Sequence, residues 1–216
     1  MATIRLYRKE DKKSVRTLAA KTAHFGESGS AIFPDTKLLG FLLTEYFLRK
    51  EAKHVWVAEE EGQIVGYIMA TFRERHLKRT MFFRVIPVCA LALLANPRSL
   101  FSKRLWRMLW FIALLALSGQ LRLNIPEDKH SGAHMHINLD PQARGKGIGD
   151  ALMQTCLSHA KKVGVPNIRL RSTRMKDHCP FFEKHGFTQT DVVRSTLLER
   201  WFNRSPVFYM EYFRKI

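Results

Sequence analysis

Residues 136 to 152 read His136-Ile-Asn-Leu-Asp-Pro-Gln142-Ala-Arg144-Gly145-Lys146-Gly147-Ile148-Gly149-Asp-Ala-Leu152. An apolar, β-branched run ends at a proline turn, a basic loop with alternate glycines follows, and the chain then continues with the spacing of an amphipathic helix. Alternate glycines let a backbone approach a ligand closely, and the N–H groups at a helix N-terminus point towards an anion. The stretch therefore predicts a strand, a phosphate-binding loop and a helix.

Two other glycine-rich loops bind phosphates, and neither matches this one. A dinucleotide-binding fingerprint has glycine where Asp150 stands, and a Walker loop has Lys-Ser or Lys-Thr after its last glycine. The residues instead resemble the acetyl-CoA loop of the GNAT superfamily of N-acetyltransferases, because Gln142-x-x-Gly145-x-Gly147 stands in the place of that family's Q/R-x-x-G-x-G/A signature. Taken alone, so short a pattern also fits a loop that merely caps a helix.

A second motif follows in the order that the resemblance requires. Residues 167 to 172 predict a short strand, and Cys179-Pro-Phe-Phe182-Glu-Lys-His-Gly-Phe187 is similar to the family's closing element, fY-E-K-x-G-F. In that family a short helix ends at the glycine and turns into the next strand. Two ordered motifs make a chance match improbable, and the resemblance covers residues 132 to 190 well and residues 1 to 72 weakly.

The resemblance implies a mixed α/β fold with a central, twisted, mostly antiparallel sheet that is flanked by helices and splayed where the coenzyme enters. Hydrophobic periodicity adds a strand at residues 4 to 6, helices around residues 15 to 19 and 38 to 47, and a hairpin of strands at 55 to 58 and 64 to 71. The end of the chain predicts a closing β-hairpin, with Val192-Val193 and Leu197-Leu198 before a turn at residues 201 to 206 and a last strand at 207 to 213.

Length and composition predict one domain over residues 1 to 216, with a helical insertion at 80 to 120. The three cysteines, Cys89, Cys156 and Cys179, are too few and too scattered for a disulfide framework or a CxxC metal site. The charged N-terminus lacks the apolar core of a signal peptide. These features predict a reduced, cytoplasmic setting.

The net charge of +17 is concentrated in the middle of the chain, where residues 73 to 125 carry ten basic side chains and one acidic side chain. Two apolar runs separated by Asn96-Pro97-Arg98-Ser99 predict a helical hairpin there. Neither run reaches the roughly 20 apolar residues of a spanning helix. Three alternatives stay open for the insertion: packing on the domain or in a homodimer, contact with a membrane surface, and a lid over an apolar acceptor. Nucleic acid is disfavoured, because the cations alternate with apolar residues and no recognition module is present.

The resemblance also implies the residues that hold the cosubstrate, acetyl-CoA. Main-chain groups of the strand preceding the loop bind the pantetheine arm, the N–H groups of the loop bind the diphosphate, and the closing element contacts the thioester. At these positions the sequence has Ile137, Asn138, Leu139, Gln142, Ala143, Arg144, Gly145, Lys146, Gly147, Ile148, Gly149 and Phe182.

The closing element departs from the family at the residue that usually protonates the leaving thiolate. That residue is a tyrosine in the family and Phe182 here, and the asparagine that often lies seven residues earlier is Met175. A phenyl ring cannot donate a proton, so the thiolate leaves unassisted or receives its proton from water or from a nearby Cys179 or Ser172.

His134 and His136 alternate on the predicted strand before the loop, so both side chains point to one face, together with Asn138. A neutral imidazole can take the proton of an attacking amine, which makes this pair the candidate general base, although such histidines are often structural. No third ligand has metal-site spacing, so we predict no metal.

These features predict an acetyl-CoA-dependent N-acetyltransferase in which a primary amine of a small molecule or a peptide attacks the acyl group directly. The alternatives are a coenzyme A-binding sensor without turnover, which Phe182 and Met175 favour, and an acyltransferase at the membrane surface that acts on lipid-linked amines. The acceptor and the acyl length cannot be read from the sequence.

Overall fold

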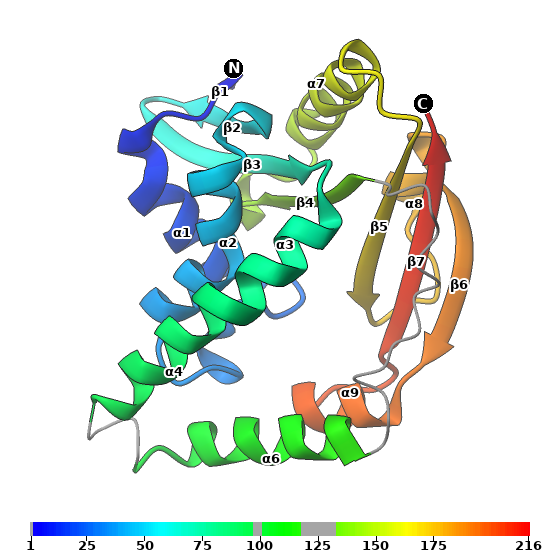
Figure 1. Cartoon of the computed structure of the whole chain (residues 1–216). Coiled ribbons are helices and arrows are strands. Elements are labelled where there is room, and N and C mark those ends of the chain that lie inside the picture. Colours follow the sequence, from blue (N-terminus) through cyan, green and yellow to red (C-terminus); the bar gives the residue numbers. More distant parts are fainter. Residues whose placement is uncertain (1, 97–100, 118–132) are drawn as a thin grey trace.

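A seven-stranded sheet organises the chain, with the strand order β1-β2-β3-β4-β5-β7-β6 (Figure 1). The computed structural model describes residues 2–96, 101–117 and 133–216. Neighbouring strands pair antiparallel except β4 and β5, which run parallel. Helices flank the sheet, so the mixed, mostly antiparallel fold that the sequence predicts is confirmed.

The strands are β1 (Thr3–Leu6), β2 (Val55–Glu60), β3 (Gln63–Thr71), β4 (Ala133–Leu139), β5 (Asn167–Arg174), β6 (Thr188–Arg194) and β7 (Phe208–Lys215). The α-helices are α1 (Lys12–Lys21), α2 (Thr36–Lys50), α3 (Glu74–Thr80), α4 (Ile86–Leu94), α6 (Lys103–Leu117), α7 (Ile148–Lys162), α8 (Pro180–Lys184) and α9 (Thr196–Phe202). Short 3-10 turns are η1 (Lys9–Asp11), η2 (Gly29–Ala31), η3 (Ala52–His54) and η5 (Pro141–Ala143), and η4 (Met81–Val85) is a π-helical segment between α3 and α4.

Two apolar layers lie on opposite faces of the sheet because side chains alternate along each strand. On β3, Tyr67 and Met69 pack with α1 and α2, whereas Ile68 and Ala70 pack in the cluster that contains residues of α7. The predicted helices α1 and α2 are confirmed. Asp35 begins α2, because its carboxylate accepts from the N–H groups of Lys37 and Leu38 at 2.8 and 3.0 Å.

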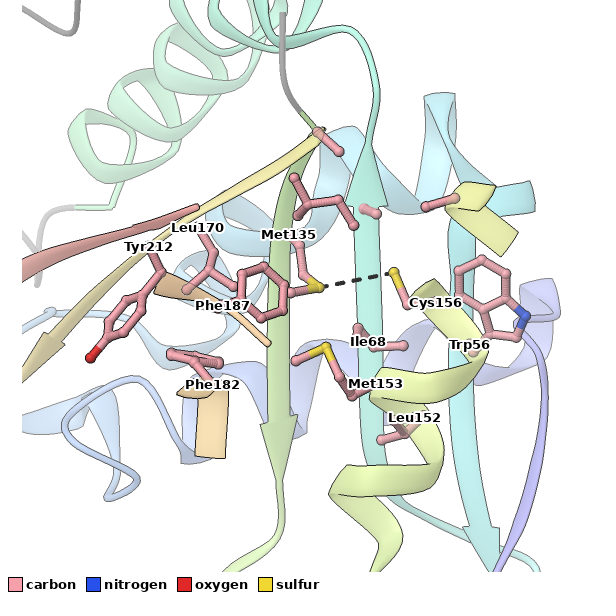
Figure 2. Close-up of a cluster of buried hydrophobic side chains, with 14 of the residues drawn as sticks. Trp56, Ile68, Met135, Leu152, Met153, Cys156, Leu170, Phe182, Phe187 and Tyr212 are labelled. Carbon is pink, nitrogen blue, oxygen red and sulfur yellow. Dashed lines mark hydrogen bonds between the residues drawn. The ribbon is translucent and has the colours of Figure 1, made fainter. Parts of the chain in front are cut away.

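The larger cluster joins α7 to the sheet and to α8 (Figure 2). Leu152, Met153 and Cys156 of α7 are fully buried against the strands. The Cys156 thiol donates to the Met135 sulfur at 3.9 Å, and Phe187 lies in the same cluster beyond the end of α8. This packing fixes the start of α7 relative to β4, the strand that precedes it.

The segment between β3 and β4 contains two helical arms. The first runs from Glu74 to Leu94 through α3, η4 and α4, and the second is α6. Leu93 of α4 and Leu105 of α6 are buried in a third cluster with residues of α1 and α2. At its other end α6 reaches α9, where the rings of Phe111 and Trp201 stack with centroids 4.6 Å apart. Helix α6 therefore bridges the α1–α2 layer and α9 (Figure 1). The predicted turn between the arms falls partly on residues 97–100, outside the described residues.

The prediction for residues 196 to 202 is wrong. Leu197 and Leu198 lie in helix α9 and not in a strand, and the sequence up to Phe202 is helical as well. The Ser195 hydroxyl accepts from the Leu198 N–H at 3.2 Å and caps the helix, and Asn203 ends it in the left-handed conformation. Strands β6 and β7 still pair antiparallel on either side of α9.

Candidate active site

Strands β4 and β5 share only two residue pairs before they diverge. The parallel pairing joins Ala133 to Ile168 and His134 to Arg169, and no later pair is formed between these strands. By contrast, β4 pairs with β3 continuously up to Leu139. Within the described residues, one edge of β4 beyond residue 134 therefore has no strand partner, directly before the glycine loop.

The hydrogen bond pattern shows which residues face this open edge. The Asp140 N–H donates to the Val65 carbonyl at 2.8 Å, so it points towards β3. Because this direction alternates along an antiparallel strand, the backbone of Asn138 also points towards β3, while the backbone groups of Ile137 and Leu139 point to the open edge. The sequence predicts main-chain contacts to the coenzyme at Ile137, Asn138 and Leu139. The backbone groups of Ile137 and Leu139 are available to a ligand, whereas those of Asn138 belong to the β3–β4 ladder.

The glycine loop reaches α7 through two left-handed residues, Gly145 with φ of 77° and Gly147 with φ of 75°. Gly147 is the N-cap residue, and no side chain caps the helix. The Ala151 N–H donates to the Gly147 carbonyl at 3.1 Å, which leaves the N–H groups of Ile148 and Gly149 in the unpaired first turn. A Cβ on Gly145 or Gly147 would meet nothing within 4 Å. The loop thus presents unpaired N–H groups beside open space.

The beginning of the predicted phosphate loop is closed on itself. The Ala143 N–H donates to the Asp140 carbonyl at 2.9 Å and the Arg144 N–H donates to the Pro141 carbonyl at 3.4 Å, while the Gln142 N–H donates to the Asp140 carboxylate at 3.2 Å. Ala143 is also buried in the core. These three main-chain donors are used inside the loop, and the donors left for an anion begin at Gly145.

The cationic side chains of the loop contact neighbouring segments. Arg144 donates to the Gly26 carbonyl at 3.3 Å, and Lys146 lies 3.2 Å from the Glu60 carboxylate. Gly26 has a φ of 86°, and a Cβ there would lie 2.4 Å from the Arg144 guanidinium. Glycine at this position therefore lets the α1–α2 connection approach the loop closely.

The first turn of α7 also contacts the closing element. Asp150 accepts from Lys184 at 3.0 Å and lies 2.9 Å from His185 Nε2, and the bonds from these two residues lower its pKa. A Cβ on Gly149 would lie 3.2 Å from both Leu139 and Phe181. The absence of a side chain at Gly149 thus brings α7, β4 and α8 together.

The predicted histidine pair lies on the opposite face of β4 from α7. His134 and His136 have their Nε2 atoms 3.1 Å apart, and the His136 ring meets the edge of Phe47 with centroids 5.5 Å apart. Burial lowers the pKa of His134 to about 4, and the charges of Arg171 and Lys78 add to this shift. Burial also lowers the pKa of His136 to about 3, with a smaller contribution from His134.

Both imidazoles are therefore neutral at pH 7. In a hydrogen bond between two neutral imidazoles, one Nε2 carries the proton and the other accepts it. Burial keeps the pair uncharged because it disfavours the protonated form. The pair can still accept a proton from a group that is bound beside it.

Polar partners around this pair were not identified from the sequence: Tyr67, Tyr46, Glu51 and His76. Asn138 donates its amide to the Tyr67 hydroxyl at 2.6 Å on the same face of the sheet. Further along, the Tyr46 hydroxyl donates to Glu51 at 3.1 Å and lies 3.1 Å from His76 Nδ1. This second group links α2 to α3 beside β3. The antiparallel register of β3 and β4 places Tyr67 beside Asn138, and that register cannot be read from either strand alone.

The closing element lies in the core. Phe182 is 8% exposed, and its ring packs against those of Phe187 and Tyr212, with centroids 6.2 and 5.3 Å apart. Cys179 is fully buried, and its sulfur accepts from Arg174 at 3.0 Å. Ser172 is half-buried on β5. The coenzyme contact predicted for Phe182 stays a prediction, and Cys179 is poorly placed as a proton donor.

Several solved structures resemble this chain, and two of the three described below are named as acetyltransferases. The protein named SsHAT is 23% identical with a TM-score of 0.69, and the match covers 99% of this chain and 98% of that one. The putative acetyltransferase yncA from Salmonella typhimurium, solved with its cofactor acetyl-CoA, is 13% identical with a TM-score of 0.59 over 99% and 93% of the two chains. An agmatine N-acetyltransferase is 16% identical with a TM-score of 0.57 over 100% and 99%.

The fold and the open strand edge beside a glycine loop are the arrangement that the sequence leads us to expect of an acyl-CoA-dependent transferase. The model of the acetyltransferase (GNAT) family matches residues 24–187. The chain belongs to this family and is an N-acetyltransferase that uses acetyl-CoA as its cosubstrate.

Proposed function

We propose that the protein transfers the acetyl group of acetyl-CoA to a primary amine by direct attack, with His136 and His134 as the proton-accepting pair. The observation that carries this proposal is the divergence of β4 from β5 after His134, next to the left-handed glycine loop. Three features lie around β4: an unpaired backbone edge, a helix start whose N–H groups can bind an anion, and a neutral imidazole pair.

The coenzyme is held by backbone groups in this proposal. The N–H groups from Gly145 to Gly149 bind the diphosphate, since they point out of a helix start that no side chain caps. The open edge at Ile137 and Leu139 binds the pantetheine arm. An N–H of that edge also stabilises the oxyanion that forms when the thioester carbonyl is attacked.

The amine approaches from the histidine face of β4. Its nitrogen forms a bond to the thioester carbon. The amine proton passes to the ring nitrogen that the His134–His136 hydrogen bond leaves free, which is the Nδ1 of the imidazole whose Nε2 donates. The C–S bond then breaks, and the thiolate leaves with its electron pair. With Phe182 in the core, the thiolate takes its proton from water, and the imidazole returns its own proton to solvent.

Direct attack is favoured over an acyl-enzyme because the thiols are inaccessible. Cys89, Cys156 and Cys179 are free and buried. Burial raises the pKa of Cys89 to about 11 and that of Cys156 to about 12. A buried thiol that stays protonated is a poor nucleophile.

The acceptor is a primary amine of a small molecule or a peptide. One structure with the same fold is named for agmatine, and a panel of amines that includes agmatine is a reasonable start.

Two measurements on the full chain test this proposal. Calorimetric titration with acetyl-CoA should give saturable binding, and the release of free coenzyme A thiol should depend on an added amine. Binding without thiol release across amino sugars, polyamines, lysine and peptide N-termini would favour a coenzyme sensor instead. A burst of thiol release without an acceptor, together with a stable acetylated protein, would favour an acyl-enzyme.

A further inference from the structure

Apolar side chains gather on the outside of the two helical arms of the insertion. Of the large hydrophobic residues that are exposed in the described chain, most lie between residues 82 and 110. We call this set the arm patch, and it comprises Phe82, Phe83, Ile86, Val88, Leu91, Leu94, Phe101, Trp106, Leu109 and Trp110. Their exposed fractions run from 44% to 87%.

A different set of residues packs the arms on the protein. On the first arm, Val85, Cys89 and Leu93 recur every four residues and are buried. On α6, Leu105 is buried and packs with residues of the α1–α2 layer. The opposite side of α6 presents a separate stripe at helical spacing, made by Trp106, Leu109, Trp110 and Ala113. Each arm therefore has one apolar side that packs and another that is exposed.

The charge around the patch is of a single sign. The sequence has no Asp or Glu from residue 75 to residue 126. The described arms carry exposed Arg84, Lys103 and Arg104 among the apolar residues. A second copy docked face to face would oppose cations to cations, which disfavours self-association through this patch. Exposed tryptophans beside cations are instead the combination that fits an anionic lipid surface.

Among the helices described, none is both long enough and apolar enough to cross a membrane. Helix α6, at Lys103–Leu117, is shorter than the roughly 20 residues that a span requires. We propose that the arm patch docks the protein on an anionic membrane surface, with its aromatic side chains in the interface and its cations at the lipid headgroups. Figure 1 places α4 and α6 at the end of the molecule away from α7, so docking leaves α7 clear of the lipid.

Vesicle flotation with the full-length protein tests the proposal. The protein should float with vesicles of equal phosphatidylcholine and phosphatidylglycerol, and more weakly with phosphatidylcholine alone. The double variant Phe83→Ser/Trp110→Ser, with one change on each arm, should lose at least about tenfold in partitioning, because each removes a large apolar contact with lipid. The matched control Val163→Ser/Val193→Ser changes two residues that are 48% and 51% exposed elsewhere and should float like the wild type.

The cations are tested separately with a control variant of matched net charge. Arg84→Gln/Arg104→Gln should weaken binding to the anionic vesicles by about fivefold for each cation removed. Lys13→Gln/Lys176→Gln loses the same charge outside the arms and should have a much smaller effect. Unaltered acetyl-CoA binding and thermal unfolding would show that each variant is folded.

Three results would overturn the proposal. The first is a wild-type protein that does not bind anionic vesicles. The second is equal flotation of the Phe83→Ser/Trp110→Ser variant and its control. The third is a concentration-dependent dimer in sedimentation velocity that this variant abolishes, since the patch would then meet a second copy of the chain.

Discussion

His134 and His136 lie on one face of β4 with their Nε2 atoms 3.1 Å apart. Residues two apart on a strand always share a face, but here the rings also turn towards each other, with centroids 4.7 Å apart and nearly perpendicular planes. Burial makes the charged form of either ring unfavourable. The two rings therefore form a neutral proton acceptor on this face of β4 and not a permanent cation.

We expect His136→Ala to lower kcat at neutral pH by about 100-fold or more, which is the usual contribution of a positioned general base. The Kd for acetyl-CoA should be unchanged, because the proposed coenzyme contacts come from the backbone of the loop and the open edge. Steady-state thiol release and calorimetry measure the two effects. His159→Ala is the matched control, since His159 also bonds a second histidine, His54, at 2.8 Å, but lies on α7. Equal kcat in the two variants would clear His136 of this role.

The buried histidines predict a loss of stability in mild acid. Burial lowers the pKa of His54 to about 4, as it does for His134, and that of His136 to about 3. An unfolded histidine has a pKa near 6.5, so between about pH 6.5 and pH 4 the unfolded chain binds more protons than the folded one. The free energy of unfolding should therefore fall as the pH falls through this window, by up to about 1.4 kcal/mol per pH unit for each group.

Urea denaturation at several pH values in this window measures the slope. His54→Gln removes one of these groups and should reduce the slope, whatever it does to the stability at neutral pH. A stability that does not change across the window would mean that these rings take up protons in the folded state as readily as in the unfolded one.

The left-handed glycine of the loop gives a prediction about coenzyme affinity. Gly147→Ala has room for the new Cβ but must hold an alanine at a φ of 75°, which costs roughly 1 kcal/mol. If the N–H groups beside it bind the diphosphate, the methyl group and any shift of the loop should raise the Kd for acetyl-CoA by about tenfold or more, the value of one hydrogen bond to a charged group.

Gly164→Ala is the control for this variant. Gly164 follows the other end of α7 with a φ of 72° and equally open surroundings. It should lose similar stability in thermal unfolding and keep the wild-type Kd in calorimetry. A similar loss of affinity in both variants would show that the effect comes from the helix as a whole and not from the loop.

The glycine loop, strand β4 and helices α1 and α2 could be predicted because their signals are local. Glycine spacing, the Asp35 cap and the buried stripe of α1 each depend on residues within a few positions of one another. The partners of the histidines could not be predicted, because Tyr67 and Phe47 reach them through strand register and helix packing. For the same reason the sequence predicts that the main-chain groups of Ala143 and Asn138 contact the coenzyme. Their hydrogen bonds within the protein depend on geometry that residue spacing does not encode.

Helix α9 was missed for a different reason. The apolar residues of this segment suit either a strand or a helix: Leu197, Leu198, Trp201 and Phe202. The segment also lies between β6 and β7, which pair with each other. Ser195 is a residue that favours a helix N-cap, and Thr196-Leu-Leu-Glu199 has the spacing of a helix-start signal, but the apolar doublets favour a strand. In the structure the helix provides Trp201, which stacks on Phe111 of α6, a contact that a tight hairpin turn would not offer.

Phe182 gives a test of how the thiolate is protonated. Its ring is 8% exposed among Phe187, Phe181 and Tyr212, so a hydroxyl added to it must enter an apolar cluster, which costs about 1–3 kcal/mol without a partner. We expect Phe182→Tyr to lower the midpoint of thermal unfolding and to leave kcat within about twofold of the wild type. Phe187→Tyr, in the same cluster and 3% exposed, should be destabilised similarly and serves as the control. If Phe182→Tyr alone raised kcat and introduced an alkaline limb in the pH profile, the ring would reach the thiol. Protonation by water would then have to be abandoned.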